Sequence, residues 1–191
     1  MASIKSGWVH VVITAMTPEP MSGLVIRPAV AADARGIASV HVATWRAAYR
    51  GVFPDAYLAG LSVDEREVRW SAALARGRPE LWVAEHEAQI IGWVAFGPSR
   101  DTEVIPRIAE IEAFYVLPSC WSTGAGRQLW LAVRQRLKEQ DFAAVMLWVL
   151  AGNERAMRFY RAAGFAPSSV PPRTFTLAGV STSDVRYERP L

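Results

Sequence analysis

Hydrophobic and polar positions follow two different periods along this chain, one typical of helices and one typical of strands. Apolar residues at helical spacing predict helices over residues 31–49, 62–76, 127–140 and 153–163. Short apolar or alternating runs predict strands over residues 24–27, 81–85, 90–96, 110–117, 144–150, 173–177 and 185–189. This order of elements, β-α-α-β-β-β-α-β-α-β-β, predicts a mixed α/β sheet with helices on both faces.

Local signals support several of these elements. Ser62 and Glu65 are spaced as in a capping box, in which each side chain binds a free backbone N–H at the start of a helix. Gly164 stands where a helix commonly ends in a left-handed residue. The run 144–150 is almost wholly apolar, which indicates a central strand buried on both faces.

Composition is typical of a globular protein. The chain has 191 residues, of which 51% are hydrophobic and 20% charged, enough for one domain with its own core. We expect residues 24–191 to form that domain and residues 1–23 to form a flexible extension. The extension resembles a signal peptide only weakly, because its apolar part is short and contains His10. No apolar run approaches the roughly 18 residues of a membrane span, so we expect a cytoplasmic protein with no membrane partner.

Charge and cysteine content narrow the classes of function. The net charge of +3 is small and no block of like charges forms a basic arm, so nucleic acid is not an expected partner. Cys120 is the only cysteine, which excludes an internal disulfide. His10, His41 and His86 do not have the spacing of zinc ligands, so no metal is expected.

The segment 110–127 carries the first functional signal. An apolar strand ends at Pro118, and the chain enters a helix through Gly124 and Gly126. The first N–H groups of a helix are unpaired and lie at the positive end of its dipole, so this turn predicts a phosphate site. Leu129 stands where a dinucleotide-binding fingerprint needs its third glycine, and the Lys and Ser/Thr of a P-loop are absent. The remaining interpretations are a cradle of backbone amides for phosphate and a tight turn without a ligand.

A second motif follows the apolar strand. Residues Asn153 to Phe165 match the pattern N-x-x-A-x-x-F-Y-x-x-x-G-F at every specified position. Together with the glycine turn, this motif resembles the GCN5-related N-acetyltransferase (GNAT) family, whose members transfer an acetyl group from acetyl-CoA to an amine. Trp121 departs from the family pattern, which has Gln or Arg there. The resemblance covers most of the chain.

The resemblance implies both a fold and a mode of cofactor binding. The sheet would be mostly antiparallel and splayed between its two central strands, and the pantetheine arm of acetyl-CoA would insert into the splay. The turn would hold the pyrophosphate, the Val116 N–H would polarise the thioester carbonyl, Asn153 would bind pantetheine, and Tyr160 would protonate the departing thiolate. The residues implied in cofactor binding are Tyr115, Val116, Trp121, Ser122, Thr123, Gly124, Ala125, Gly126, Arg127, Asn153 and Tyr160.

The attacking amine must also lose a proton. Glu110 and Glu112 lie on the same face of a strand by two-residue alternation. Glu110 matches the family position that often carries a base, whereas Glu112 lies nearer the expected acceptor channel. Each role competes with that of an ordinary solvated or ion-paired strand carboxylate.

Aromatic residues occur in the segment that walls the acceptor site in this family. They are Trp45, Tyr49, Phe53 and Tyr57. Their spacing is also typical of a core-facing helix, and for Trp45 we expect a place in the core. Aromatic rings left exposed there would favour an apolar acceptor.

The resemblance therefore predicts an N-acetyltransferase that uses direct attack by the amine in a ternary complex, with Tyr160, Glu110 and Glu112 as catalytic residues. A small-molecule amine is the expected acceptor. The alternatives are a macromolecular amine, such as a protein N-terminus, a lysine or an aminoacyl-tRNA, and a non-catalytic CoA-binding or sensor module. A homodimer is a further expectation, because members of the family often dimerise.

Overall fold

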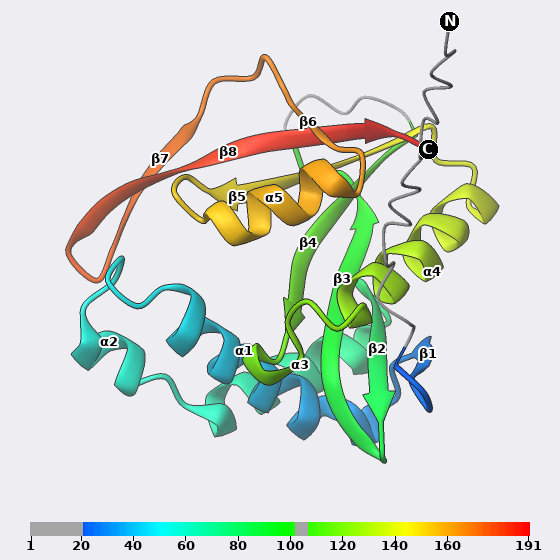
Figure 1. The fold of residues 1–191 in the computed structure, drawn as a ribbon, viewed down its shortest axis with the longest axis horizontal. Helices are drawn as coiled ribbons and strands as arrows, with labels where there is room; N and C mark the ends of the chain where they lie inside the picture. The colour runs from blue at the N-terminus through cyan, green and yellow to red at the C-terminus, as the bar shows by residue number, and fades with distance from the viewer. Residues whose placement is uncertain (1–20, 102–106) are drawn as a thin grey trace, which may run out of the picture.

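The computed structural model describes residues 21–101 and 107–191, whose arrangement is shown in Figure 1. The strands form one sheet in the order β1-β2-β3-β4-β5-β8-β6, and β7 pairs with β8. The strands are β1 (Val25–Pro28), β2 (Glu80–His86), β3 (Gln89–Pro98), β4 (Ile108–Val116), β5 (Ala144–Leu150), β6 (Ala166–Pro167), β7 (Arg173–Leu177) and β8 (Val180–Pro190). The helices are α1 (Ala34–Ala48), α2 (Asp55–Ala59), α3 (Val63–Arg76), α4 (Ala125–Glu139) and α5 (Glu154–Ala162), with the 3-10 turns η1 (Ala31–Asp33) and η2 (Pro118–Cys120).

The predicted mixed α/β fold is confirmed, and each predicted helix and strand has a counterpart close to its predicted position. The short elements α2 and β6 were missed, because neither is long enough to show a period. The last strand is longer than predicted, since β8 pairs with β5, β6 and β7 and is supported along its length. Most of the predicted extension, residues 1–20, lies outside the described residues. Within the described ranges, no helix is long and apolar enough to cross a membrane.

The sheet is splayed at its centre, as the family resemblance implied. Every strand pair is antiparallel except β4 with β5, which run parallel. Their pairing extends only from Ile108 opposite Ala144 to Ile111 opposite Leu147. Beyond this point β4 continues to Val116 without pairing to β5, so the two strands diverge and leave a gap between them.

A β-bulge interrupts β4 at the point where the strands diverge. Ala95 of β3 lies opposite Ala113, but the next residue, Phe96, lies opposite Ile111. Glu112 is therefore an extra residue without a partner on β3, and such bulges bend a strand and re-aim its side chains.

Helices cover both faces of the sheet, with α1 and α3 on one and α4 and α5 on the other (Figure 1). Successive side chains of β3 alternate between these layers. Trp93 is fully buried with Ile37 of α1 and Trp70 of α3, whereas Val94 belongs to the cluster that contains Leu129 of α4. The two cores fix the helices against the sheet on either side of the splay.

The predicted helix ends are also found. Ser62 Oγ accepts a hydrogen bond from the Glu65 N–H at 3.2 Å, which caps α3. Gly164 follows α5 with a φ of +87°, a left-handed conformation that disfavours other residues.

Candidate functional site

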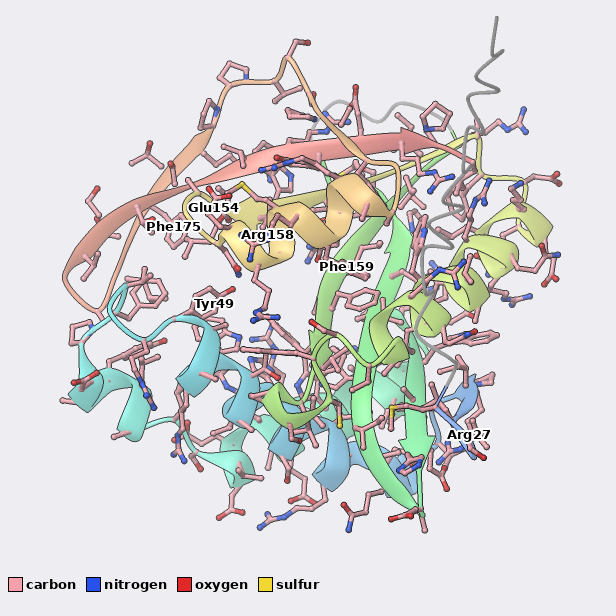
Figure 2. All side chains as sticks on the ribbon, in the orientation of Figure 1. Arg27, Tyr49, Glu154, Arg158, Phe159 and Phe175 are labelled. Atoms are coloured by element: carbon pink, nitrogen blue, oxygen red, sulfur yellow. The ribbon has the colours of Figure 1, made fainter. Side chains whose placement is uncertain are left out.

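A cavity of about 910 Å³ opens where β4 and β5 diverge. Residues of α1, β4, the turn before α4, β5, α5, β7 and β8 line it. Figure 2 shows Arg158 and Phe159 reaching it from α5, and Tyr49 and Phe175 contributing from the end of α1 and from β7. The cavity therefore joins the two faces of the sheet through the gap between the strands.

Val116 presents its backbone to this gap. The Leu117 N–H donates to the Ile91 carbonyl at 2.8 Å, so these residues form a hydrogen-bonded antiparallel pair. Val116 and Gly92 form the next pair, which by the same alternation points its backbone groups outward. The Val116 carbonyl accepts from Thr44 Oγ1 at 3.1 Å and from Trp121 Nε1 at 2.8 Å. Its N–H is directed away from β3, towards the space that β5 has left.

The turn before α4 presents unpaired amides to the same cavity. Ser122 and Gly124 have φ values of +64° and +96°, and α4 begins directly afterwards without a side-chain cap. The first N–H groups of α4 therefore remain available to an anion. Gly126 packs closely against α5: a Cβ there would lie 3.3 Å from the Phe159 ring, which would have to move by a few tenths of an ångström to accept it.

Not every residue of the turn lines the cavity with its side chain. Ala125 is fully buried, and Thr123 Oγ1 donates to the Cys120 carbonyl at 2.8 Å. Neither belongs to the lining, so each can contribute only its backbone. Ser122 and Arg127 do belong to the lining.

Trp121, the departure from the family pattern, packs between two elements. Its indole N–H binds the Val116 carbonyl, and the guanidinium carbon of Arg155 lies 4.4 Å from the centre of its ring. Such a contact between a cation and an aromatic face is attractive. Trp121 therefore carries no charge itself, but the guanidinium of Arg155 supplies a positive charge next to it.

Asn153 and Tyr160 are both in the cavity wall. Asn153 Oδ1 accepts from the Ala156 N–H at 3.1 Å and so caps α5, which leaves the Nδ2 group as the donor of this side chain, close to the Tyr49 hydroxyl. Tyr160 is 9% exposed, and its ring packs against Phe159 and Phe165. Burial raises the pKa of the Tyr160 hydroxyl, so the group keeps its proton at neutral pH.

Glu110 and Glu112 both bind the guanidinium group of Arg100. Arg100 donates to Glu110 from its backbone N–H at 3.0 Å, from Nε at 3.1 Å and from Nη2 at 2.5 Å. Arg100 Nη1 lies 2.9 Å from Glu112 Oε2. Glu110 is buried, with 4% exposure, whereas burial raises the pKa of the more open Glu112. The two carboxyl groups therefore share a cation but differ in how many donors they already bind.

The aromatic segment forms one wall. Trp45 was expected in the core, and that expectation was wrong in part: the residue is half-buried and lines the cavity with Tyr49 and Phe53. Its indole N–H donates to the Tyr115 hydroxyl at 3.0 Å, which turns the ring edge towards β4. Tyr57 is half-buried but does not belong to the lining.

No residue of the wall formed by β5, β7 and β8 was predicted from the sequence as part of the site. Trp148, Phe175 and Asp184 line the cavity from these strands. The available signal was the alternation of side chains along the last two strands. It shows which residues share a face of the sheet, but not which other elements pack against that face. Arg155 and Arg158 were also missed. Their spacing of three residues places them on one side of α5.

No group of three or more His, Cys, Asp or Glu side chains suited to a metal ion occurs within residues 21–101 and 107–191.

Known proteins resemble this chain in sequence and in fold. Residues 42–165 match the model of the Acetyltransferase (GNAT) family. The uncharacterized N-acetyltransferase YuaI of Bacillus subtilis is 32% identical over 161 residues, covering 84% of this chain and 89% of its own. The PaiA N-acetyltransferase of Thermoplasma acidophilum, solved in complex with coenzyme A, has a TM-score of 0.72 at 19% identity and covers 88% of this chain and 99% of its own. A phosphinothricin acetyltransferase of Sinorhizobium meliloti, solved with acetyl-CoA, has a TM-score of 0.67 at 23% identity and covers 88% of this chain and 89% of its own. The two solved structures are similar in fold.

Proposed function

We propose, from the premise that the chain belongs to the acetyltransferase (GNAT) family, that this N-acetyltransferase moves an acetyl group from acetyl-CoA to a primary amine of a small molecule. The observation that carries the proposal is a juxtaposition in one cavity. The Val116 N–H, the first amides of α4 and the Tyr160 hydroxyl all border the gap between β4 and β5.

The residues at the α4 end of the cavity fit a ligand that carries several phosphate groups. Arg127, Arg155 and Arg158 line this end, and no ion pair of the described residues involves them. Unpaired guanidinium groups beside free helix amides favour anions, and they bind phosphate in a bidentate way. We propose that these side chains and the amides of residues 121–127 hold the phosphates of acetyl-CoA.

The gap between the strands suits the narrow arm of that molecule. Backbone N–H and C=O groups of β4 border the gap beyond Ile111, because β5 no longer pairs with them there. An extended arm with amide groups can bind such an edge as an added strand does. The Nδ2 group of Asn153, whose Oδ1 caps α5, provides a further donor at the start of that helix.

Two groups would act on the reacting atoms. Acetyl-CoA supplies an acyl group activated as a thioester. The Val116 N–H would donate to the acyl oxygen and stabilise the negative charge that develops there. Tyr160, kept protonated by burial, would deliver its proton to the departing sulfur.

Glu112 is the better candidate for the base. Glu110 accepts three hydrogen bonds from Arg100, so few of its lone pairs remain for an amine proton. Glu112 shares only one close contact with that guanidinium, and its raised pKa makes it a stronger acceptor of protons. We assign Glu110 the positioning of Arg100, and Glu112 the proton transfer, directly or through a water molecule.

The size of the cavity favours a small acceptor. Its volume of about 910 Å³ must hold part of the donor as well, and aromatic side chains of α1 and the segment after it line the remaining space. An exposed acceptor mouth with a basic stripe would favour an aminoacyl-tRNA instead. The cations on the side of the aromatic wall, Arg100 and Arg173, are both ion-paired with carboxylates, which gives that alternative less support.

The test is an acceptor screen over amino acids, polyamines, aminoglycosides and peptides, with release of free CoA thiol as the measurement. Acetyl-CoA should raise the thermal midpoint of the protein, because a ligand that binds the native state stabilises it. Binding without transfer to any amine would support the sensor alternative. The absence of any shift with acetyl-CoA would refute the proposal.

A further inference from the structure

The two ends of the cavity differ in charge. The α4 end is lined by three unpaired arginine residues, as described above. On the opposite side, towards β7 and β8, the lining includes Arg100 and Arg173, but both are already bound to carboxylates. Arg100 binds Glu110 and Glu112, and Arg173 binds Asp101. Both cations that line this side are therefore already ion-paired.

Asp184 is the carboxylate on this side that has no partner. It lies on β8, with Leu150 of β5 and Arg173 of β7 as its neighbours across the sheet. The side chain is half-buried, and no hydrogen bond or ion pair among the described residues involves it. Its neighbour Arg173 stacks on Trp148, with the guanidinium carbon 3.8 Å from the ring centre, and is held by Asp101. Burial raises the pKa of Asp184, and the Arg173 charge opposes this effect.

The strand period places Asp184 among apolar and aromatic groups. Cross-strand neighbours share a face, so Asp184 lies on the same face as Leu150. Leu150 packs in a cluster with Phe53 and, at its edge, Tyr49 and Phe175. Phe175 and Tyr49 both border the cavity on this side (Figure 2).

Asp184 also stands apart from the proposed base. Glu112 lies on β4 and binds Arg100, whereas Asp184 lies on β8 opposite Leu150, beyond the point where β5 stops pairing with β4. The two carboxyl groups therefore lie on opposite sides of the gap between β4 and β5. A carboxylate that paired with the reacting amine would hold it as an unreactive ammonium ion, so a position away from the base suits a different group of the acceptor.

We propose that Asp184 binds a second, non-reacting ammonium group, so that the preferred acceptor is a diamine with an apolar chain between its two nitrogen atoms. This inference rests on the proposed function. An ammonium group would satisfy the half-buried carboxylate through a charge-assisted hydrogen bond. The rings of Tyr49 and Phe175 would favour the same cation and would cover the apolar chain.

The experiment compares linear diamines of three to eight carbons with the n-alkylamines of the same length. The measured quantity is kcat/KM for CoA thiol release in the wild type, in Asp184→Asn and in Asp141→Asn. Asp141 is an exposed aspartate after α4 and serves as the matched control. Acetyl-CoA affinity by calorimetry and the thermal midpoint show whether each variant is folded, and Asp184→Ser replaces Asp184→Asn if the latter is not.

We expect the wild type to prefer at least one diamine over its monoamine by about tenfold or more, mainly through KM, as one charged hydrogen bond allows. Asp184→Asn should lose this preference, because its kcat/KM falls much more for the diamine than for the monoamine, and Asp141→Asn should behave as the wild type. An equal loss for both classes of amine in Asp184→Asn would overturn the inference, as would a wild type without the preference. Transfer to monoamines alone would leave the proposed function intact, whereas acetyl-CoA binding without transfer to any amine would end both.

Discussion

Tyr160 is a buried side chain whose surroundings keep its hydroxyl protonated. Its ring packs between Phe159 and Phe165, and burial raises the pKa of its hydroxyl. The hydroxyl is therefore protonated and can donate when a neighbouring atom gains negative charge. The sequence motif located this residue, but its burial and its place in the cavity wall come from the packing of α5 on the sheet.

We predict that Tyr160→Phe lowers kcat by about 100-fold, because general acid catalysis contributes at least that much in enzymes that use it. The affinity for acetyl-CoA should change little, since the ring and its contacts remain. Steady-state kinetics and calorimetry measure the two effects. Tyr187→Phe is the control, as Tyr187 is a buried tyrosine that does not line the cavity. A Tyr160→Phe enzyme as fast as the wild type would remove this residue from the mechanism.

A second prediction at the residue scale concerns the two glutamates of β4. Burial raises the pKa of Glu112 above 4.5, and the carboxylate form is the one that accepts a proton. The activity of the wild type should therefore fall as the pH drops through that raised pKa, and Glu112→Gln should lower kcat by about 100-fold and abolish this dependence.

Glu110→Gln should behave differently. It removes charge from the Arg100 pair but leaves the proposed base in place, so a smaller loss of kcat with the pH dependence retained is expected. The pH profiles of both variants provide the measurement. Retention of the profile in Glu112→Gln together with its loss in Glu110→Gln would reverse the assignment.

At the scale of elements, α5 carries a positive charge in its first turn, where the helix dipole disfavours a cation. Arg155 lies in the first turn, at the positive end of the helix dipole, where a cation is destabilising by a few tenths of a kcal/mol to about 1 kcal/mol. Its guanidinium lies over Trp121, which belongs to the turn that leads into the uncapped start of α4. A residue that is unfavourable for its own helix but lines a phosphate-sized site indicates a binding role.

We predict that Arg155→Ala weakens acetyl-CoA binding by about tenfold, the worth of one charged hydrogen bond, without lowering the thermal midpoint. Arg161→Ala is the matched control on the same helix, where Arg161 lies near Tyr187 and Glu154 instead. Calorimetry with CoA and with dephospho-CoA then locates the contact. Equal losses for both ligands would assign Arg155 to the pyrophosphate, and a loss for CoA alone would assign it to the 3′-phosphate. Unchanged affinity for both would contradict the prediction.

At the scale of the whole molecule, a buried histidine links pH to stability. His41 is 5% exposed, accepts a hydrogen bond from Trp70 Nε1 at 3.1 Å and stacks on Tyr115. Burial, helped by the charges of Arg66 and Arg69, lowers its pKa from 6.5 to about 3. The unfolded chain therefore binds this proton below pH 6.5, while the native protein resists it until about pH 3, so stability falls as the pH falls across this range.

The expected cost of His41 protonation between pH 7 and pH 4.5 is about 2–3 kcal/mol in the free energy of unfolding. His41→Gln keeps an acceptor for Trp70 and removes the titrating group, so its stability should fall less over the same range. Urea denaturation of both proteins at several pH values measures the difference. Parallel curves for the two proteins would show that His41 does not have the lowered pKa.

The sequence by itself determined the elements of this fold and predicted the donor side of its candidate site. Periodicity marked the helices and strands because it depends on residues close in the chain, and two glycines beside a helix start indicate free amides wherever the helix packs. The family motif from Asn153 to Phe165 then predicted acetyl-CoA as the ligand of those amides. These features are local, so neighbouring residues suffice to predict them.

Only the tertiary structure decided which residues from distant parts of the chain these local elements contact. The hydrogen bond of Trp45 to Tyr115 joins residues 70 apart in sequence, and Arg155 reaches Trp121 from another helix. The bulge at Glu112 and the register of β8 against β5 determine where Glu112 and Asp184 lie relative to the cavity. A shift of one residue would move each side chain to the other face of the sheet. The acceptor side therefore depends on register and on packing between distant segments, which the pattern of residues along the chain does not specify.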